Sequence, residues 1–241
     1  MNFKDAVVLV TGANRGLGRS LVEASVEAGA RRVYAGARDP KQLEGLVARS
    51  PDRIIPLQLD ITSASSLEAA AARATDATVL INNAGVLAAY GVLASSAAEL
   101  EADFATNFFG MIATTRAFLP ALERAGRAAI VNVLSVASLA SVPALGGYSA
   151  SKAASFSATQ ALRSDVAKRN ISVHAVLPGA IDTDMVRAME MPKTSPDAVA
   201  KSIIDGVQQG LEEIFPDPIS RQMVEVWKRD PKALERQLAS M

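Results

Sequence analysis

The sequence predicts an α/β protein built on one parallel β-sheet, doubly wound, with helices on both faces. Short continuous apolar runs, such as residues 6–10, alternate with helical patterns along the chain, and neither repeats nor low-complexity linkers interrupt them. Strands buried on both faces of a parallel sheet have such runs, and strand–helix alternation is typical of a doubly wound sheet. A chain of 241 residues fits a single domain of this class over residues 1–241.

Expected elements follow from this alternation. Strands are expected at residues 6–10, 32–37, 54–59, 78–81, 129–134, 171–177 and 214–215. Helices are expected after Gly16 and at residues 63–75, 100–122, 148–169 and 195–210. His174 falls inside the sixth strand pattern, so we interpret it as a packed histidine rather than a catalytic one.

Composition and charge exclude several classes of function. Without cysteine there are no disulfides, thiolate catalysts or cysteine metal sites, and the single histidine cannot form a histidine-rich site, so no metal is expected. Lys and Arg (25) balance Asp and Glu (25), so no net charge attracts nucleic acid or an anionic membrane. Neither a membrane-spanning run nor a signal peptide is recognisable. We therefore expect a cytoplasmic protein without nucleic-acid or membrane partners.

A glycine-rich turn, Thr-Gly-Ala-Asn-Arg-Gly-Leu-Gly at residues 11–18, joins the first strand to the first helix. Gly12 permits the tight turn, Gly16 lets backbone N–H groups approach a pyrophosphate, and Gly18 allows the helix to pack closely on the strand. The strand–turn–helix context favours a dinucleotide site over an ordinary flexible loop.

The end of the second strand bears on the choice of dinucleotide. Arg38 lies where the chain is expected to meet the adenosine ribose, and an arginine there suits a 2′-phosphate whereas an acid suits a 2′-hydroxyl. Arg15, inside the glycine turn, is placed to contact the same phosphate. Asp39 is the competing acid, one position later. We predict NADP(H), with NAD(H) or simple solvent-facing arginines as the alternatives.

Tyr148 and Lys152 are four residues apart, on one face of a predicted helix. A cation beside a phenol favours the phenolate, so we expect the pKa of Tyr148 to lie below its usual value of about 10. Such a tyrosine exchanges a proton with a substrate oxygen near neutral pH. The pair alone is weak evidence. Its support is a set of residues at predicted strand ends, which meet at one edge of a parallel sheet: Gly12, Arg38, Asp60, Asn83, Ser135, Pro178 and Gly179.

Together these motifs resemble those of the short-chain dehydrogenase/reductase family in its single-domain form. The resemblance covers about residues 5–215 and rests on TGANRGLG (11–18), Asp60, NNAG (82–85), Asn107, Ser135, YSASK (148–152) and PGAIDT (178–183). It implies a Rossmann fold of about seven strands. It also implies hydride transfer between a nicotinamide dinucleotide and a carbonyl or alcohol, here an NADPH-dependent carbonyl reductase.

The resemblance implies individual roles as well. Tyr148 would be the general acid or base, Lys152 would lower its pKa and hold the nicotinamide ribose, and Ser135 would hydrogen-bond the substrate oxygen. Asn107 matches the asparagine that anchors a water in the family's proton relay; a helix-kinking role without chemistry is the alternative. With the glycine turn and arginines above, the expected cofactor-binding residues are Gly12, Asn14, Arg15, Gly16, Leu17, Gly18, Arg38, Asp60, Ile61, Asn83, Ala84, Gly85, Tyr148, Lys152, Pro178, Gly179, Ile181 and Thr183.

Residues at about 184–195 are expected to form a lid over the nicotinamide. Met185 and Met189 of this lid, with Val136 and Leu145 of an uncharged loop, predict a tolerant apolar pocket and hence an apolar aldehyde or ketone as substrate. Arg187 is the lid cation that would either pair with a substrate carboxylate or point to solvent.

The tail, at about 216–241, departs from the glycine-rich end of many family members. This weakens the inference of a tetramer, so a homodimer is expected, with a tetramer possible. Whether the tail covers a partner's pocket is left open by the sequence.

Two alternative functions remain open. One is NAD-linked oxidation of an alcohol by the same residues. The other is a regulator that senses NADP(H) without chemistry, although relatives of that kind usually lack the tyrosine–lysine pair that this chain retains.

Overall fold

Seven parallel strands form one sheet in the computed structural model, which describes residues 1–240. Their spatial order is β3-β2-β1-β4-β5-β6-β7, so the direction of winding reverses between β1 and β4. The strands are β1 (Val7–Thr11), β2 (Arg32–Ala37), β3 (Ile54–Gln58), β4 (Val79–Asn82), β5 (Ala128–Val133), β6 (Ile171–Val176) and β7 (Glu213–Ile214). The doubly wound parallel sheet expected from the sequence is confirmed.

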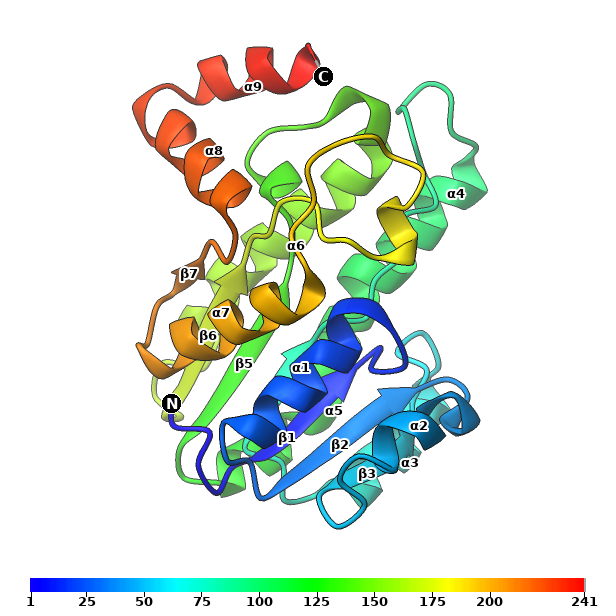
Figure 1. Cartoon of the computed structure of the whole chain (residues 1–241), viewed down its shortest axis with the longest axis vertical. Helices are drawn as coiled ribbons and strands as arrows, with labels where there is room; N and C mark the ends of the chain where they lie inside the picture. Colours follow the sequence, from blue (N-terminus) through cyan, green and yellow to red (C-terminus); the bar gives the residue numbers. More distant parts are fainter. Residues whose placement is uncertain (241) are drawn as a thin grey trace.

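Helices cover both faces of the sheet (Figure 1). One face carries α1 (Gly16–Glu27), α2 (Glu44–Val47) and α7 (Pro196–Gln208), and the other carries α3 (Ala64–Arg73), α5 (Met111–Arg124) and α6 (Gly146–Asp165). The packing of β1 explains the apolar run at residues 7–10. Val8 and Val10 pack in the core of the first face, and Val7 and Leu9 in that of the second. A strand covered on both faces favours apolar side chains along its length, and the polar Thr11 of β1 comes at its carboxyl end.

The long helix expected at residues 100–122 is present and extends over residues 97–124, but its middle is a π-helix, which the sequence did not predict. α4 (Ala97–Asp103) and α5 flank a seven-residue π-helix, Phe104–Gly110. Widened turns of this kind often occur at functional positions. Asn107 lies in the middle of the segment and makes long-range side-chain bonds, which the local apolar spacing of the sequence does not reveal.

The boundaries of α6 also differ from expectation. It begins at Gly146 and ends at Asp165, whereas residues 148–169 were expected. Residues 166–170 form a turn instead, and Asn170 adopts a left-handed conformation (φ 54°) before the chain enters β6. Asn tolerates this conformation better than most residues, which suits it to the last position of the turn.

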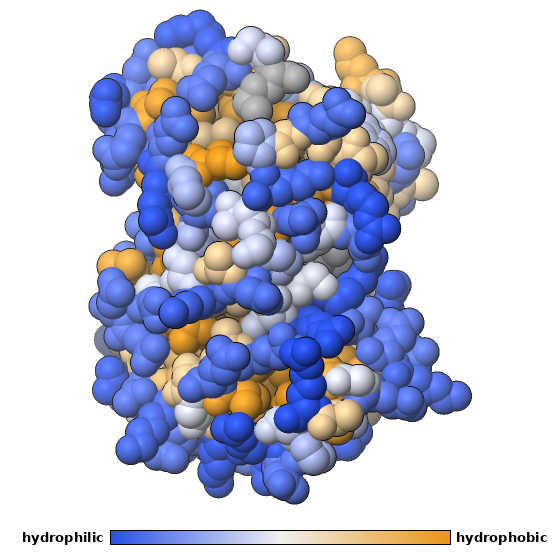
Figure 2. All heavy atoms as spheres, in the orientation of Figure 1, coloured by the Kyte–Doolittle hydropathy of each residue, from blue (hydrophilic) through white to orange (hydrophobic). Residues whose placement is uncertain are grey.

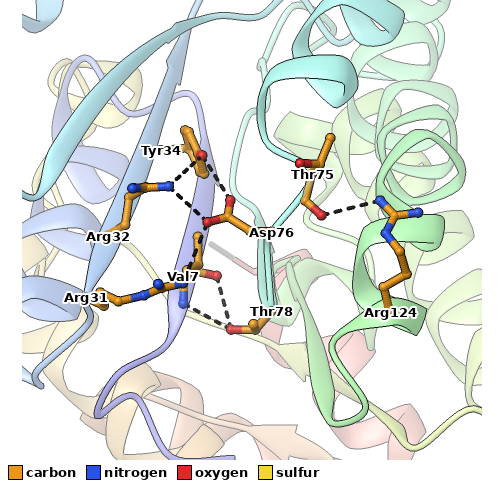
Figure 3. A network of polar contacts seen from close by, with 8 residues as sticks. All are labelled: Val7, Arg31, Arg32, Tyr34, Thr75, Asp76, Thr78 and Arg124. Atoms are coloured by element: carbon orange, nitrogen blue, oxygen red, sulfur yellow. Dashed lines mark hydrogen bonds and ion pairs between the residues drawn. The ribbon is translucent and has the colours of Figure 1, made fainter.

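At the edge where the strands begin, a polar network joins β1, β2 and the segment before β4 (Figure 3). The Asp76 carboxylate accepts hydrogen bonds from the Arg32 guanidinium and the Tyr34 hydroxyl, both at 2.9 Å. The Thr78 hydroxyl accepts from the backbone N–H of Val7 and donates to its carbonyl. These contacts fix the starting positions of neighbouring strands.

The chain ends in two helices, α8 (Pro218–Arg229) and α9 (Pro231–Ala239). They lie at the end of the molecule toward which the strands point, near the lid (Figure 1). Polar side chains cover most of the face shown in Figure 2, and apolar atoms are visible around these two helices. Among residues 1–240, no helix combines the length and apolarity needed to cross a membrane.

Candidate active site

A cavity of about 820 Å³ opens at the carboxyl edge of the sheet. Parallel strands place their carboxyl ends, and the loops that follow, at this edge. Every residue that the sequence assigned to the dinucleotide lines the cavity, from Gly12 in the glycine turn to Thr183 in the lid segment. Ser135 also lines it, whereas Asn107 lies behind its wall. The structure therefore gathers residues from distant parts of the chain around one space.

The glycine turn is shaped for close approach of a ligand. Gly12 and Gly16 have positive φ angles of 65° and 52°, which side-chain-bearing residues rarely adopt. A Cβ atom at Gly18 would lie 2.0 Å from the Gly12 carbonyl oxygen, so α1 can pack against the turn only with glycine there. The N-terminus of α1 has no side-chain cap, and its N–H groups suit an anion. The turn thus fits a dinucleotide pyrophosphate.

Asn83 holds the turn against the neighbouring strand end. Its amide nitrogen donates to the carbonyls of Thr11 (2.9 Å) and Gly12 (3.2 Å). The Thr11 hydroxyl in turn accepts from the backbone N–H groups of Asn83 and Ala84. These bonds join the ends of β1 and β4, the two strands between which the winding reverses.

Arg38, Asp39 and Asp60 form the polar end of the cavity. Hydrogen bonds from the Thr62 hydroxyl and backbone N–H hold the pKa of Asp60 below its usual range, and the Arg38 guanidinium lowers it further. The Asp39 carboxylate accepts from the backbone N–H of Lys41 and caps the short helix at Pro40–Leu43. The acid that competed with Arg38 in the sequence is therefore engaged in a local cap.

Arg15 forms an ion pair with Asp184 at the start of the lid, at 3.2 Å. Asp184 also pairs with Arg187, which does not line the cavity. The contact of Arg15 with a ribose phosphate, expected from the sequence, would have to replace or share the pair with Asp184. The sequence left open whether Arg187 pairs with a substrate carboxylate or points to solvent. In the structure it lies away from the cavity.

Tyr148 and Lys152 lie one turn apart on α6, as their spacing predicts. The Lys152 ammonium lies 5.7 Å from the centroid of the Tyr148 ring and donates to the Val133 carbonyl at 3.0 Å. Ser135 begins the short helix at Val136–Ser138, where its hydroxyl oxygen accepts from the Ala137 N–H. The end of β5 and the first turns of α6 thus bring the three side chains to the same cavity wall.

The pKa of Tyr148 is raised, whereas the sequence predicted that it would be lowered. Burial raises the pKa of Tyr148 to about 12; a hydrogen bond with Ser135 lowers it, and the charge of Asp103 raises it. Burial lowers the pKa of Lys152 to about 8, against the opposing effect of Asp103. The lowered pKa of Tyr148 expected from the spacing was wrong for the protein by itself. Sequence spacing predicts proximity of the two groups but not the desolvation that dominates here.

Asp103 is a site residue that the sequence reasoning missed. It is the last residue of α4, it is fully buried, and its two carboxylate oxygens accept from the backbone N–H groups of Ala88 (2.9 Å) and Ala89 (3.1 Å). Those bonds hold the loop after β4, part of which lines the cavity. The sequence contained one signal that could have identified Asp103: it is an acidic residue one helical turn before Asn107, on the same face of the predicted helix.

Asn107 uses its whole side-chain amide within the protein. Its oxygen accepts from the Val86 N–H (2.9 Å), and its nitrogen donates to the Val86 carbonyl (3.0 Å) and the Ser151 hydroxyl (2.9 Å). Its backbone carbonyl accepts from the Ser155 hydroxyl at 3.0 Å. Asn107 therefore connects the π-helix, the loop after β4 and α6, immediately behind the tyrosine–lysine pair.

The apolar part of the cavity contains all four residues expected to meet the substrate: Val136, Leu145, Met185 and Met189. Three further lining residues come from the tail, Ile219, Met223 and Leu238, and were not anticipated. The tail therefore lines the cavity of its own chain.

His174 takes no part in this site. One ring nitrogen contacts the Leu211 carbonyl at 2.6 Å and the other contacts the Ser172 hydroxyl at 2.9 Å. Burial lowers its pKa, so the ring is held neutral near neutral pH. It is a packed histidine of β6, in agreement with the interpretation of the sequence.

The short chain dehydrogenase family model matches residues 6–193. Among curated relatives, the short chain dehydrogenase pigC of Monascus ruber is 35% identical over 192 residues, which are 74% of this chain and 63% of the relative. The 3-oxoacyl-[acyl-carrier-protein] reductase FabG of Vibrio cholerae is 30% identical, over 78% of this chain and 79% of the relative. The matches span only 63%, 58% and 44% of three of the curated relatives.

Solved structures show the same family along the whole chain. A short chain dehydrogenase from Burkholderia cenocepacia, in complex with NADP, is 37% identical, with 99% of both chains covered and a TM-score of 0.92. A short-chain dehydrogenase from Sphingobium yanoikuyae, in complex with NADPH, is 26% identical, with 93% of both chains covered and a TM-score of 0.80. The first of these similarities includes the tail, which the family model does not match.

Proposed function

The chain belongs to the short chain dehydrogenase family, and from this premise we propose that it is an NADPH-dependent carbonyl reductase acting on an apolar aldehyde or ketone. The observation that carries the proposal is that Tyr148, Ser135 and Lys152 line the same cavity as the glycine turn. We further propose that the whole chain, with its lid and tail, works as one dinucleotide-binding unit.

The proposed chemistry divides between the dinucleotide and the chain. When bound, the reduced nicotinamide supplies a hydride to the carbonyl carbon. Tyr148 donates its proton to the carbonyl oxygen, and the Ser135 hydroxyl stabilises the charge on that oxygen with a hydrogen bond. A pKa of about 12 keeps Tyr148 protonated near neutral pH, which suits a proton donor in reduction. The Lys152 ammonium, with a pKa of about 8, remains mostly charged there and stabilises the phenolate left behind.

The preference for NADP(H) is supported by Arg38 and Asp39. Arg38 is an exposed cation lining the cavity after β2, and the Asp39 carboxylate is engaged at the cap of the following helix. The B. cenocepacia relative is in complex with NADP. Replacement of Arg38 by Ala should raise the KM for NADPH by about 10-fold or more, since a charge-assisted bond contributes about 1.5–3 kcal/mol. The KM for NADH should change little.

The exposed Lys41, which does not line the cavity, provides the control. Lys41→Ala removes a nearby positive charge and should leave both KM values unchanged. Equal effects of Arg38→Ala on NADPH and NADH would contradict the preference and support the NAD-linked alternative.

An apolar substrate is supported by the walls of the lid. Met185 and Met189 line the cavity. Arg187 does not line it and is paired with Asp184, and Glu190 adds a negative charge to the lining that repels carboxylates. A spectrophotometric screen of NADPH and NADH against aldehydes, aryl ketones, quinones and keto acids tests this proposal directly. Faster turnover of keto acids than of aryl ketones would contradict it. Tight NADPH binding without turnover of any carbonyl would favour the sensing regulator instead.

A homodimer and a cytoplasmic location complete the proposal. The π-helix leaves Phe109 62% exposed on the side of the α4–α5 helices, which are surfaces suited to a second copy of the chain. Light scattering should give the mass of two chains, and a mass of four would favour a tetramer. Cell fractionation tests the location.

A further inference from the structure

The tail is anchored directly to the turn after β6. Asp217 is fully buried, and one of its carboxylate oxygens accepts from the backbone N–H of Gly179 at 2.8 Å. Its other oxygen accepts from the Ser220 N–H at 2.8 Å, which caps α8. A Cβ atom at Gly179 would lie 2.9 Å from the Asp217 carboxylate and 3.1 Å from Ile219. The first turn of α8 therefore packs against backbone that itself lines the active-site cavity.

From this anchor the two helices continue over the apolar part of the cavity. Met223 on α8 and Leu234 and Leu238 on α9 pack in one cluster with Leu134 and Val136, the residues on either side of Ser135. All three tail residues are buried, at 7%, 0% and 1% exposure. The three residues differ in their position relative to the cavity, however. Met223 and Leu238 line it, whereas Leu234 packs behind it.

The lid and the tail contribute the same kind of side chain to the cavity. Met185, Met189 and Met191 of the lid and Met223 of the tail make up four of the seven methionines in the chain. Methionine has a flexible, polarizable side chain that adapts to different apolar shapes. Leu238, in the same cluster as Met223, has a shorter side chain with fewer rotatable bonds. It therefore forms the firmer part of the same apolar wall.

We propose that α8 and α9 form the substrate wall of their own chain, and that Met223 and Leu238 determine the size of the apolar group accepted on the carbonyl. This inference rests on the proposed reductase function. It names the substrate class as carbonyl compounds with a bulky apolar group, and it assigns specificity to the same protomer rather than to a partner's tail.

A pair of matched variants on α9 tests the proposal. Leu238→Ala and Leu234→Ala remove the same atoms from buried positions on one helix, but only the first enlarges the cavity. The ratio of kcat/KM for cyclohexyl phenyl ketone to that for propiophenone is measured with NADPH in each full-length variant. Leu238→Ala should raise this ratio about 10-fold, a usual effect of altered apolar fit. Leu234→Ala should leave it within about twofold, although both variants lower the melting temperature.

A third variant makes the cavity smaller instead of larger. It does not create the void that destabilises the two alanine variants. Met223→Phe adds volume at the wall and should lower the same ratio, through a higher KM for the bulkier ketone. Equal ratios in wild type, Leu238→Ala and Met223→Phe would overturn the proposal, as would equal changes in Leu238→Ala and Leu234→Ala.

A binding measurement separates this proposal from the proposed activity. Trp227, the only tryptophan of the chain, packs on the same cluster from α8, so its fluorescence reports occupation of the wall. Titration with cyclohexyl phenyl ketone should change the emission of wild type, and Leu238→Ala should alter the apparent Kd more than Leu234→Ala does. If no carbonyl is reduced but this difference in Kd remains, the reductase proposal fails and the wall proposal stands. Identical Kd values in the two variants would overturn the wall proposal even in an active enzyme.

Discussion

The two edges of the sheet carry the same three kinds of side chain in different surroundings. Where the strands begin, Tyr34 lies with Arg32 and Asp76; where they end, Tyr148 lies with Lys152 and Asp103. In both places the cation is close to the aromatic ring, 5.8 Å from the centroid for Arg32 and 5.7 Å for Lys152. Composition alone therefore does not distinguish a structural cluster from a catalytic one.

The difference lies in how the polar groups are paired. Asp76 bonds directly to Arg32 and Tyr34, and its side chain is 35% exposed, so each charge has a partner and solvent. Asp103 and Lys152 are buried and instead bond to backbone groups, Asp103 to N–H groups and Lys152 to a carbonyl. The charge of Asp103 acts on Tyr148 through space, next to a cavity. A cluster whose members satisfy one another stabilises the fold, whereas one held by the backbone can keep its reactive groups free for a ligand.

The largest expected difference between the clusters is in turnover. Tyr148→Phe removes the proposed proton donor and should lower kcat by about 10²–10⁴-fold, while NADPH binding, measured by fluorescence titration, is retained. Tyr34→Phe removes the matching hydroxyl and should leave kcat within about twofold, with a loss of about 1 kcal/mol in the free energy of unfolding. Retention of more than a tenth of wild-type kcat by Tyr148→Phe would contradict the assigned role.

The pH dependence of stability should reveal the buried lysine. The pKa of Lys152 is about 8 in the folded chain, below its ordinary value of 10.5, so the folded protein binds fewer protons between these pH values. The free energy of unfolding should therefore rise with pH across this window, by up to about 3 kcal/mol from this group. Urea unfolding at pH 7.5, 9 and 10 should show this rise in wild type but not in Lys152→Met. Parallel pH dependences in the two proteins would exclude a lowered pKa of Lys152 in the folded chain.

Removal of the charge of Asp103 should cost stability as well as alter the site. In Asp103→Asn an amide NH₂ faces one of two buried backbone N–H groups, so we expect a loss of about 2–3 kcal/mol in denaturant unfolding. The pKa of Tyr148 should also fall, because the carboxylate that raises it is gone. A spectrophotometric titration of tyrosine ionisation, with Tyr148→Phe to identify the signal, tests this effect. An unchanged titration would show that Asp103 acts only on the loop.

The smallest effect on stability and turnover is expected at the edge of the sheet where the strands begin. Asp76→Asn removes an ion pair that solvent already screens, so the loss should be about 1 kcal/mol or less, and turnover should not change. Differential scanning calorimetry and steady-state kinetics measure the two quantities. A fall in kcat comparable to that of Asp103→Asn would show that the two edges are not separate in function.

Much of the site was predictable because its signals are local. The glycine turn, Arg38 and Ser135 each follow an apolar run, and parallel strands necessarily bring such residues to one edge. The spacing of Tyr148 and Lys152 on a helix is likewise a local property. These patterns led to the fold class and to the lining residues of one cavity.

Tertiary structure decided what depends on burial and on distant partners. The π-helix at Asn107 is held by bonds to Val86 and Ser151, 21 and 44 positions away, which no local pattern records. The raised pKa of Tyr148 follows from desolvation, which arises only when the chain has packed around the phenol. The same holds for the tail, whose apolar residues at helical spacing predict a helix but not the surface that it covers. The sequence by itself determined which groups meet at the edge of the sheet; packing decided how strongly each is desolvated and which residues close the cavity around them.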